Sequence, residues 1–266
     1  MTLGINKLAE AAGKTLKVAP ELYDDALKPS VQESGKLLGR IPKIINAALA
    51  PLDIWILNRE YNIEKTKKLL AKNLENVSPE KIVSPEPHVA VPVLQAISYS
   101  MNSEELRNMY AKLLANSMNS DEQDNVHPCF VEIIKQLSPL DASNLSVFKG
   151  IVSYPIAEYI LKSTYGETSL KTHVFLHNDQ TSDIDLLSLS MSNLERLGLL
   201  TITYNSYLLG EHLYDNFKNH PIFVEAKNII NNPELSDKYM GWNEIYINKG
   251  IVSLTPLGRK FVDICI

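Results

Sequence analysis

Two apolar stripes between Glu104 and Ala142 constrain the fold of this chain most strongly. The first stripe follows the i, i+3, i+4, i+7, i+8 spacing of one helical face and consists of Leu106, Met109, Tyr110, Leu113 and Leu114. The second repeats that spacing with Phe130, Ile133, Ile134 and Leu137, after a proline that fits a first helical turn. Asn119, Ser120 and Asp121 lie between the stripes and favour a turn over a helix. The sequence therefore predicts a helical hairpin.

The length and the net charge limit the possible domain organisation and binding partners of the chain. With 266 residues, 45% of them hydrophobic, the chain is long enough for two globular domains. The 26 Lys and Arg residues stand against 31 Asp and Glu residues, and this net charge of −5 gives no general attraction to nucleic acid. The two cysteines, Cys129 and Cys265, form no CxxC pair, so neither a zinc site nor a disulfide framework is indicated.

The N-terminal part is expected to be helical throughout. Residues 1–33 predict a helical extension, and residues 34–137 a helical domain that contains the hairpin. Further helices are expected at Ile63–Leu74 and at Pro92–Met101, and Ser103 is expected to cap the first helix of the hairpin. Short helical turns are expected at Pro79 and Pro85, since both prolines follow a serine and precede a glutamate.

The segment between Lys36 and Leu57 combines an apolar stripe with basic residues. The stripe consists of Ile41, Ile44, Ile45, Ala48, Leu49 and Leu52. One interpretation is a core helix whose basic side chains extend to solvent. The other is a membrane-binding or partner-binding surface formed by Lys36, Arg40, Lys43 and Trp55, because cationic amphipathic helices with an aromatic residue bind membrane surfaces. The apolar stretch is too short to span a bilayer.

The C-terminal domain, residues 138–266, is expected to mix helices and strands. Ser138 begins a capping-box pattern with Asp141. The sequence predicts helices at Leu140–Val152, Pro155–Leu161 and Ser182–Leu197, and strands at Lys171–Leu176, Leu199–Tyr204 and Ile251–Leu254. In the third helix the residues expected to face inward are Ile184, Leu187, Leu189, Met191, Leu194 and Leu197, and Gly198 is expected to end the helix.

This order of elements resembles a winged helix-turn-helix domain, with residues 208–248 as a helical insertion in the wing. The predicted fold is therefore mainly α: a helical domain followed by a winged-helix-like α+β domain. The helix in the recognition position carries Asp183, Asp185 and Glu195 against the single Arg196, and phosphate contacts need cations. We therefore expect no nucleic-acid binding, unless Lys249, Arg259 and Lys260 gather on one edge.

Two groups of histidines are candidate sites of chemistry. His127 lies near a set of carboxylates that could suit a metal, namely Asp121, Glu122, Asp124 and Glu132. Acidic residues next to a helix N-terminus are expected for helix capping alone, and the spacing matches no ligand motif, so we predict no metal site there. His173 and His177 are four residues apart but in a strand and turn, so they need not share a face. No nucleotide-binding or hydrolase motif occurs.

Three stretches of the first domain resemble the abortive infection alpha family of prokaryotic proteins, over residues 34–142. They are GKLLGRIPKIINAALAPLDIWIL, SPEPHVAVPVLQAISYSMNSEELRNMYAKLLANSMN and HPCFVEIIKQLSPLDA. The resemblance implies a role in phage defence, in which an infected bacterial cell stops growing before progeny are released, and it supplies no catalytic residues.

The predicted function is therefore a non-enzymatic, cofactor-free component of phage defence that acts through protein contacts, self-association or membrane association. The alternatives are a winged-helix transcriptional regulator and a metal-dependent nuclease. No secretory signal precedes the predicted domains, so a cytoplasmic location is expected. Peripheral association with the inner face of the membrane is the alternative location. No small-molecule substrate is indicated.

Overall fold

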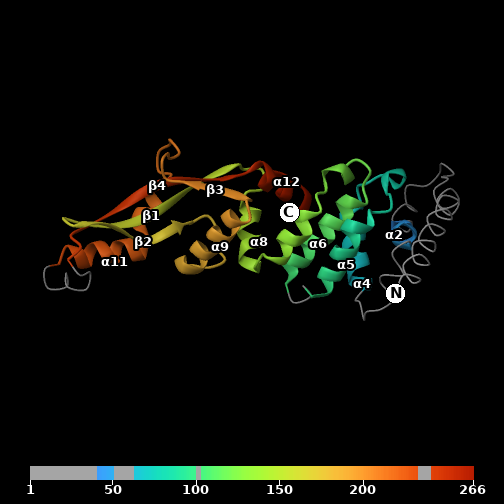
Figure 1. Cartoon of the computed structure of the whole chain (residues 1–266), viewed down its shortest axis with the longest axis horizontal. Coiled ribbons are helices and arrows are strands. Elements are labelled where there is room, and N and C mark those ends of the chain that lie inside the picture. Colours follow the sequence, from blue (N-terminus) through green and yellow to red (C-terminus); the bar gives the residue numbers. More distant parts are fainter. Residues whose placement is uncertain (1–40, 51–62, 100–102, 233–240) are drawn as a thin grey trace, which may run out of the picture. The chain divides into compact units, whose positions relative to one another are not determined.

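The computed structural model describes residues 41–50, 63–99, 103–232 and 241–266. These residues form two compact units that divide between Gln136 and Leu137, and each unit is described by itself (Figure 1). The predicted N-terminal extension, residues 1–33, lies outside the described residues, as do Lys36, Arg40 and Trp55.

The first unit is helical. Its elements are α2 (Ile41–Leu49), α4 (Ile63–Asn73), the 3₁₀ turn η2 (Pro79–Lys81), α5 (Pro87–Tyr99), α6 (Glu104–Ser117), η3 (Gln123–Asn125) and α7 (Cys129–Lys135). The predicted hairpin is confirmed as α6 and α7, which pack on each other and on α5. The Ser103 side chain accepts a hydrogen bond from the Leu106 backbone N–H at 3.3 Å, which confirms the predicted cap. Helix α5 begins at Pro87, ahead of the predicted start at Pro92.

The second unit combines helices with one sheet. Its elements are α8 (Pro139–Val147), β1 (Ser153–Ser163), β2 (Gly166–Val174), α9 (Ile184–Arg196), β3 (Leu200–Thr203), α10 (Asp215–Asn219), α11 (Pro221–Ile230), β4 (Glu244–Leu254) and α12 (Pro256–Cys265). The capping box at the start of α8 is confirmed: Ser138 Oγ accepts from the Asp141 N–H, and Asp141 Oδ2 accepts from the Ser138 N–H. Gly198 follows α9 with a φ of +72°, as expected for a glycine that ends a helix.

The four strands form one antiparallel sheet in the order β2-β1-β4-β3 (Figure 1). The central pair, β1 and β4, stays in register from Ser153 opposite Ser253 to Lys162 opposite Glu244. One face of the sheet packs on α10 and α11, and this core also takes in Ile184 at the start of α9. Its fully or nearly buried members include Tyr159, Leu161, Val174, Tyr214, Phe217, Phe223, Ala226, Ile230 and Ile245. Strands β2 and β3 and helix α8 hold α9 in place.

The predicted helix at Pro155–Leu161 is wrong, because these residues belong to the central strand β1. Most of their side chains are buried, since β1 has a strand on each side and packed side chains on both faces. A short, nearly continuous apolar run has the same appearance in a buried strand and in a buried helix, so periodicity could not separate the two. Pairing with the neighbouring β2 and with β4, which is distant in sequence, decided the outcome.

The fold is therefore α+β and not the mainly α class that the sequence predicted. The β1–β2 hairpin separates α8 from α9, where the winged-helix prediction required a second helix, and the winged-helix resemblance is not confirmed. The predicted helical insertion at 208–248 contains α10 and α11, but its last residues begin strand β4 at Glu244. Strand β2 also begins earlier than predicted, at Gly166.

Candidate functional site

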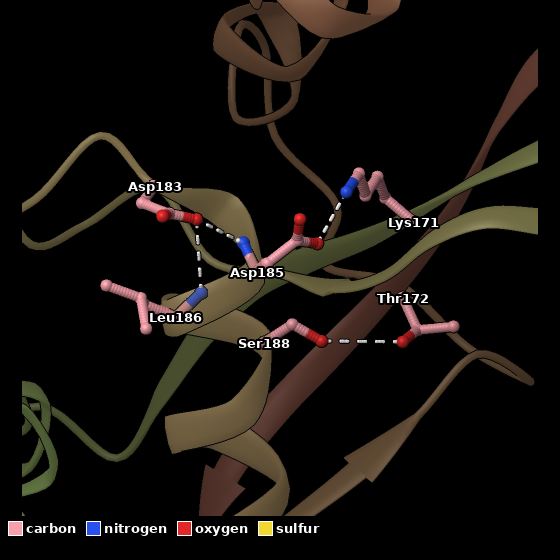
Figure 2. Close-up of polar contacts among 6 residues, drawn as sticks. All are labelled: Lys171, Thr172, Asp183, Asp185, Leu186 and Ser188. Atoms are coloured by element: carbon pink, nitrogen blue, oxygen red, sulfur yellow. Dashed lines mark hydrogen bonds and ion pairs between the residues drawn. The ribbon is translucent and has the colours of Figure 1, made fainter.

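Helix α9 begins at a side-chain cap that its sequence encodes. Asp183 Oδ1 accepts hydrogen bonds from the backbone N–H groups of Asp185, at 2.9 Å, and Leu186, at 3.3 Å (Figure 2). An aspartate at this position satisfies N–H groups that have no partner inside the helix, and its charge suits the positive end of the helix dipole. The start of α9 is therefore fixed locally.

Strand β2 holds one side of α9 through a row of polar contacts. Lys171 Nζ lies 2.5 Å from Asp185 Oδ1, and the Thr172 and Ser188 hydroxyl oxygens lie 3.4 Å apart (Figure 2). Next along the row, His173 Nδ1 lies 3.1 Å from Ser192 Oγ. Ser192 Oγ also donates to the Ser188 carbonyl oxygen at 2.8 Å, and in this arrangement Ser192 accepts from the imidazole Nδ1 when that nitrogen carries the proton. His173 and Ser192 therefore extend the row of polar contacts between β2 and α9.

A bulge in β2 explains how consecutive strand residues reach the same helix. Between the pairs Ala157–Val174 and Tyr159–Lys171, β2 contains one more residue than β1. Side chains normally alternate between the two faces of a strand, and an extra residue disrupts that alternation. His173 lies within the bulge and has a φ of +48°, in the left-handed region. The bulge therefore turns this end of β2 toward α9.

The inner side of α9 is joined to α8 by a buried polar chain. Asn144 Nδ2 donates to Ser190 Oγ at 2.8 Å, and Asn178 Nδ2 donates to Asn144 Oδ1 at 2.6 Å. All three side chains are buried, so each hydrogen bond also prevents the cost of an unpaired polar group. Asparagine and serine gave no signal in the hydrophobic pattern, and the sequence-based prediction missed this network.

The outer side of α9 carries two large apolar side chains that are not covered. Leu186 is 49% exposed and Leu189 is 67% exposed. Together with the exposed Asp185, Ser192 and Arg196 they form a continuous surface, which we call the α9 face. The prediction that Leu189 faces inward is wrong. It lies two residues from Leu187 and thus off the buried stripe of Ile184, Leu187, Met191 and Leu194, a misfit that a helical projection detects.

The predicted carboxylate and histidine group near the α6–α7 turn is divided among separate local contacts. Asp121 pairs with Lys81 at 2.6 Å, and Glu132 pairs with Lys135 at 2.7 Å. His127 Nδ1 accepts from the Cys129 N–H at 3.1 Å, a contact at the start of α7. Within the described ranges, no three His, Cys, Asp or Glu side chains lie close enough together to hold a metal ion.

Of the predicted basic surface, only Lys43 lies within the described residues. Its side chain is exposed on α2, while Ile41, Ile44, Ile45, Ala48 and Leu49 of the same helix are buried. The apolar side of α2 therefore packs inside the helical unit. Among the helices that the structure describes, none has the length and apolar character needed to cross a bilayer.

His173 and His177 do not form one site. The His177 ring packs against Tyr154, with centroids 4.7 Å apart, and against Phe175, at 5.4 Å. Its Nε2 atom is buried and has no hydrogen-bond partner in the described part of the chain. Burial lowers the pKa of His177 below 6.5, because the charged ring would lose hydration that no protein group replaces.

We predict that the free energy of unfolding falls as the pH falls below about 6.5. The unfolded chain takes up a proton at His177 near the ordinary histidine pKa of about 6.5, whereas the folded chain takes it up only at lower pH. Acid therefore favours the unfolded chain. For this one group the free energy of unfolding falls by at most about 1.4 kcal/mol per pH unit. Replacement by phenylalanine should flatten the profile measured by urea denaturation. Burial also lowers the pKa of His220, which contributes a remaining slope.

The exposed His88 provides the matched control for this prediction. His88→Gln, measured in the same way, shows how much of any change in slope comes from the loss of an exposed histidine. An identical slope in the native chain and in His177→Phe would contradict the assignment to His177.

A comparison with protein families decides the identity of the chain. Residues 58–265 match the family described as abortive infection alpha. The chain belongs to the abortive infection alpha family. The family match includes α9 and the whole sheet and therefore extends well beyond Ala142, but it begins after the first of the three predicted stretches, which ends at Leu57. Searches of curated proteins and of solved structures gave no match. Membership of the abortive infection alpha family supports a role in phage defence.

Proposed function

We propose that the protein takes part in abortive phage defence without catalysing a reaction, by binding another protein through the α9 face. The observation that carries this proposal is the pair Leu186 and Leu189, exposed on a helix that is otherwise held by its cap, polar contacts and core packing. Neighbouring exposed leucines on a well-ordered helix offer a protein-binding surface, because a partner gains free energy by covering them.

The charges around α9 favour a protein partner over duplex DNA. From Ile151 to the C-terminus, 9 Lys and Arg residues stand against 13 Asp and Glu residues, a net charge of −4. Lys171 is paired with Asp185, and Lys249 Nζ lies 5.2 Å from the ring centroids of both Tyr207 and Tyr214. Two of the cations that a DNA-binding surface would need are therefore engaged inside the unit.

Membrane association through α2 is the weaker candidate. The five buried apolar residues of α2 would have to leave the helical unit before they could enter a lipid surface. Each buried leucine or isoleucine contributes about 1.5–3 kcal/mol to stability, so this exposure would cost several kcal/mol. The α9 face needs no such rearrangement.

The proposal predicts that the double substitution Leu186→Ser and Leu189→Ser abolishes phage defence while the protein stays folded. Both side chains are largely exposed, so their loss should change the free energy of unfolding by about 0.5 kcal/mol or less. The measurement is plaque formation on cells that express each variant, with protein level and circular dichroism recorded in parallel. Leu209→Ser is the matched control, because Leu209 is 88% exposed and lies in a loop rather than in α9.

Two outcomes would count against this proposal. Full protection by the folded double variant would show that the α9 face is not used. A shift of duplex DNA at submicromolar protein and physiological salt, lost when Arg196 and Lys249 are neutralised, would favour the transcriptional regulator instead.

A further inference from the structure

We propose that the partner of the α9 face is the α9 face of a second copy of this chain, with the two helices antiparallel about a two-fold axis. This inference rests on the proposed function, because it names the protein that the surface binds. A two-fold interface brings the same surface of both copies together, so the surface must be complementary to itself. The α9 face meets that condition in both its apolar and its charged residues.

The apolar residue Leu189 lies between opposite charges along the helix. At 3.6 residues per turn, Asp185, Leu189 and Arg196 fall within about 40° of one line on the helix surface. Leu186 lies on one flank of this line and Ser192 on the other. In an antiparallel pair the two Leu189 side chains meet near the two-fold axis, with Leu186 widening the apolar contact and the small Ser192 allowing the helices to approach.

The charges of the α9 face are separated by sign between the two ends of the helix. On this face Asp185 lies near the beginning of the helix, and Arg196, whose Nε and Nη2 atoms donate to Asn193 Oδ1, lies at its end. Glu195, also near the end, lies off this face and accepts a hydrogen bond from the Ile202 N–H. Antiparallel packing places each acidic end beside the basic end of the other copy and pairs opposite ends of the two helix dipoles. Lys171 contacts one oxygen of Asp185, but the Asp185 side chain remains 71% exposed and can accept a second cation. Parallel packing would bring like charges together.

The size of the α9 face sets the strength of the association. Two exposed leucines per copy make an apolar patch well below that of a stable, obligate dimer. The dimer should therefore be weak and should form as the protein concentration rises. Such an equilibrium suits a defence protein that must stay inactive in an uninfected cell.

Charge exchange between the two ends of α9 tests the pairing in the full-length chain. In the antiparallel pair, Asp185→Arg places two basic side chains together at each end of the contact, and Arg196→Glu places two acidic side chains together there. Each variant alone should therefore associate about tenfold more weakly than the native chain.

The double variant Asp185→Arg with Arg196→Glu restores opposite charges at both ends. An equimolar mixture of the two single variants should also associate. In a dimer with one copy of each variant, a basic side chain faces an acidic side chain at both ends of the contact. Analytical ultracentrifugation over a hundredfold range of concentration measures each case.

Recovery of association in the double variant would establish the antiparallel pairing. The double variant also controls for folding, since it contains both substitutions. Association that is unaffected by charge reversal, or a chain that stays monomeric throughout the range, would overturn the inference. If the native chain stays monomeric while the Leu186→Ser and Leu189→Ser variant still loses phage defence, the α9 face binds a different protein, and the proposed function survives without this partner.

Discussion

Gly258→Ala should unfold the second unit under conditions in which the native chain is stable, at a cost of about 3 kcal/mol or more. A Cβ atom at this position would overlap the Leu199 carbonyl oxygen and lie 2.9 Å from the Leu199 carbonyl carbon, and both are backbone atoms that cannot rotate away. Alanine elsewhere in a helix stabilises by about 0.5–1 kcal/mol relative to glycine. The sign of the effect is therefore diagnostic.

The close approach at Gly258 is fixed by hydrogen bonds on both sides. The Thr255 N–H donates to the Leu199 carbonyl oxygen at 3.0 Å, and the Gly258 N–H donates to Thr255 Oγ1 at 2.8 Å. Helix α12 thus begins directly against the start of β3. Urea denaturation followed by circular dichroism measures the effect, with Asp263→Ala as the control in an exposed position of the same helix. A Gly258→Ala protein as stable as the native chain would show that this contact is absent.

Asn144→Leu should destabilise the second unit by about 2–4 kcal/mol. The side chains of leucine and asparagine are similar in size, so the change removes two hydrogen bonds with little change of volume. Ser190 Oγ loses its donor and Asn178 Nδ2 loses one of its acceptors, both in buried surroundings. A buried group without a partner costs more than the hydrogen bond contributed.

A double-variant cycle separates this network from simple packing. Because replacing both partners of a buried hydrogen bond costs less than replacing one, Ser190→Ala in the Asn144→Leu background should cost less than Ser190→Ala in the native chain. Ser146→Ala, at an exposed position of α8, is the control for substitution in that helix. Strictly additive effects of the two substitutions would contradict a direct bond between Asn144 and Ser190.

Local chemistry predicted the helical hairpin and the helix ends well. The stripes of α6 and α7, the cap at Ser103, the capping box at Ser138 and the glycine after α9 depend on neighbours within a few residues. The resemblance to the abortive infection alpha family also came from the sequence, although the family match covers a larger part of the chain than the resemblance did.

The candidate site was only partly visible in the sequence. The acidic character of α9 was correctly identified, but Leu189 was assigned to the core. Of the predicted basic surface, Lys43 is exposed on a helix whose apolar side is buried, and the remaining members lie outside the described residues. A helical projection already separates Leu189 from the buried stripe of α9, whereas whether another element covers that side of the helix depends on the tertiary structure.

The sequence by itself determined the helices α4, α6 and α7 of the first unit, the caps at Ser103 and Ser138, and the net negative charge of the second unit. Each of these properties depends on nearest neighbours or on composition. Tertiary structure decided that Pro155–Leu161 is the central strand, that β2 bulges toward α9, and that Leu186 and Leu189 remain uncovered. These outcomes depend on contacts between residues far apart in the chain, where pairing and burial outweigh the weak local preference of each segment.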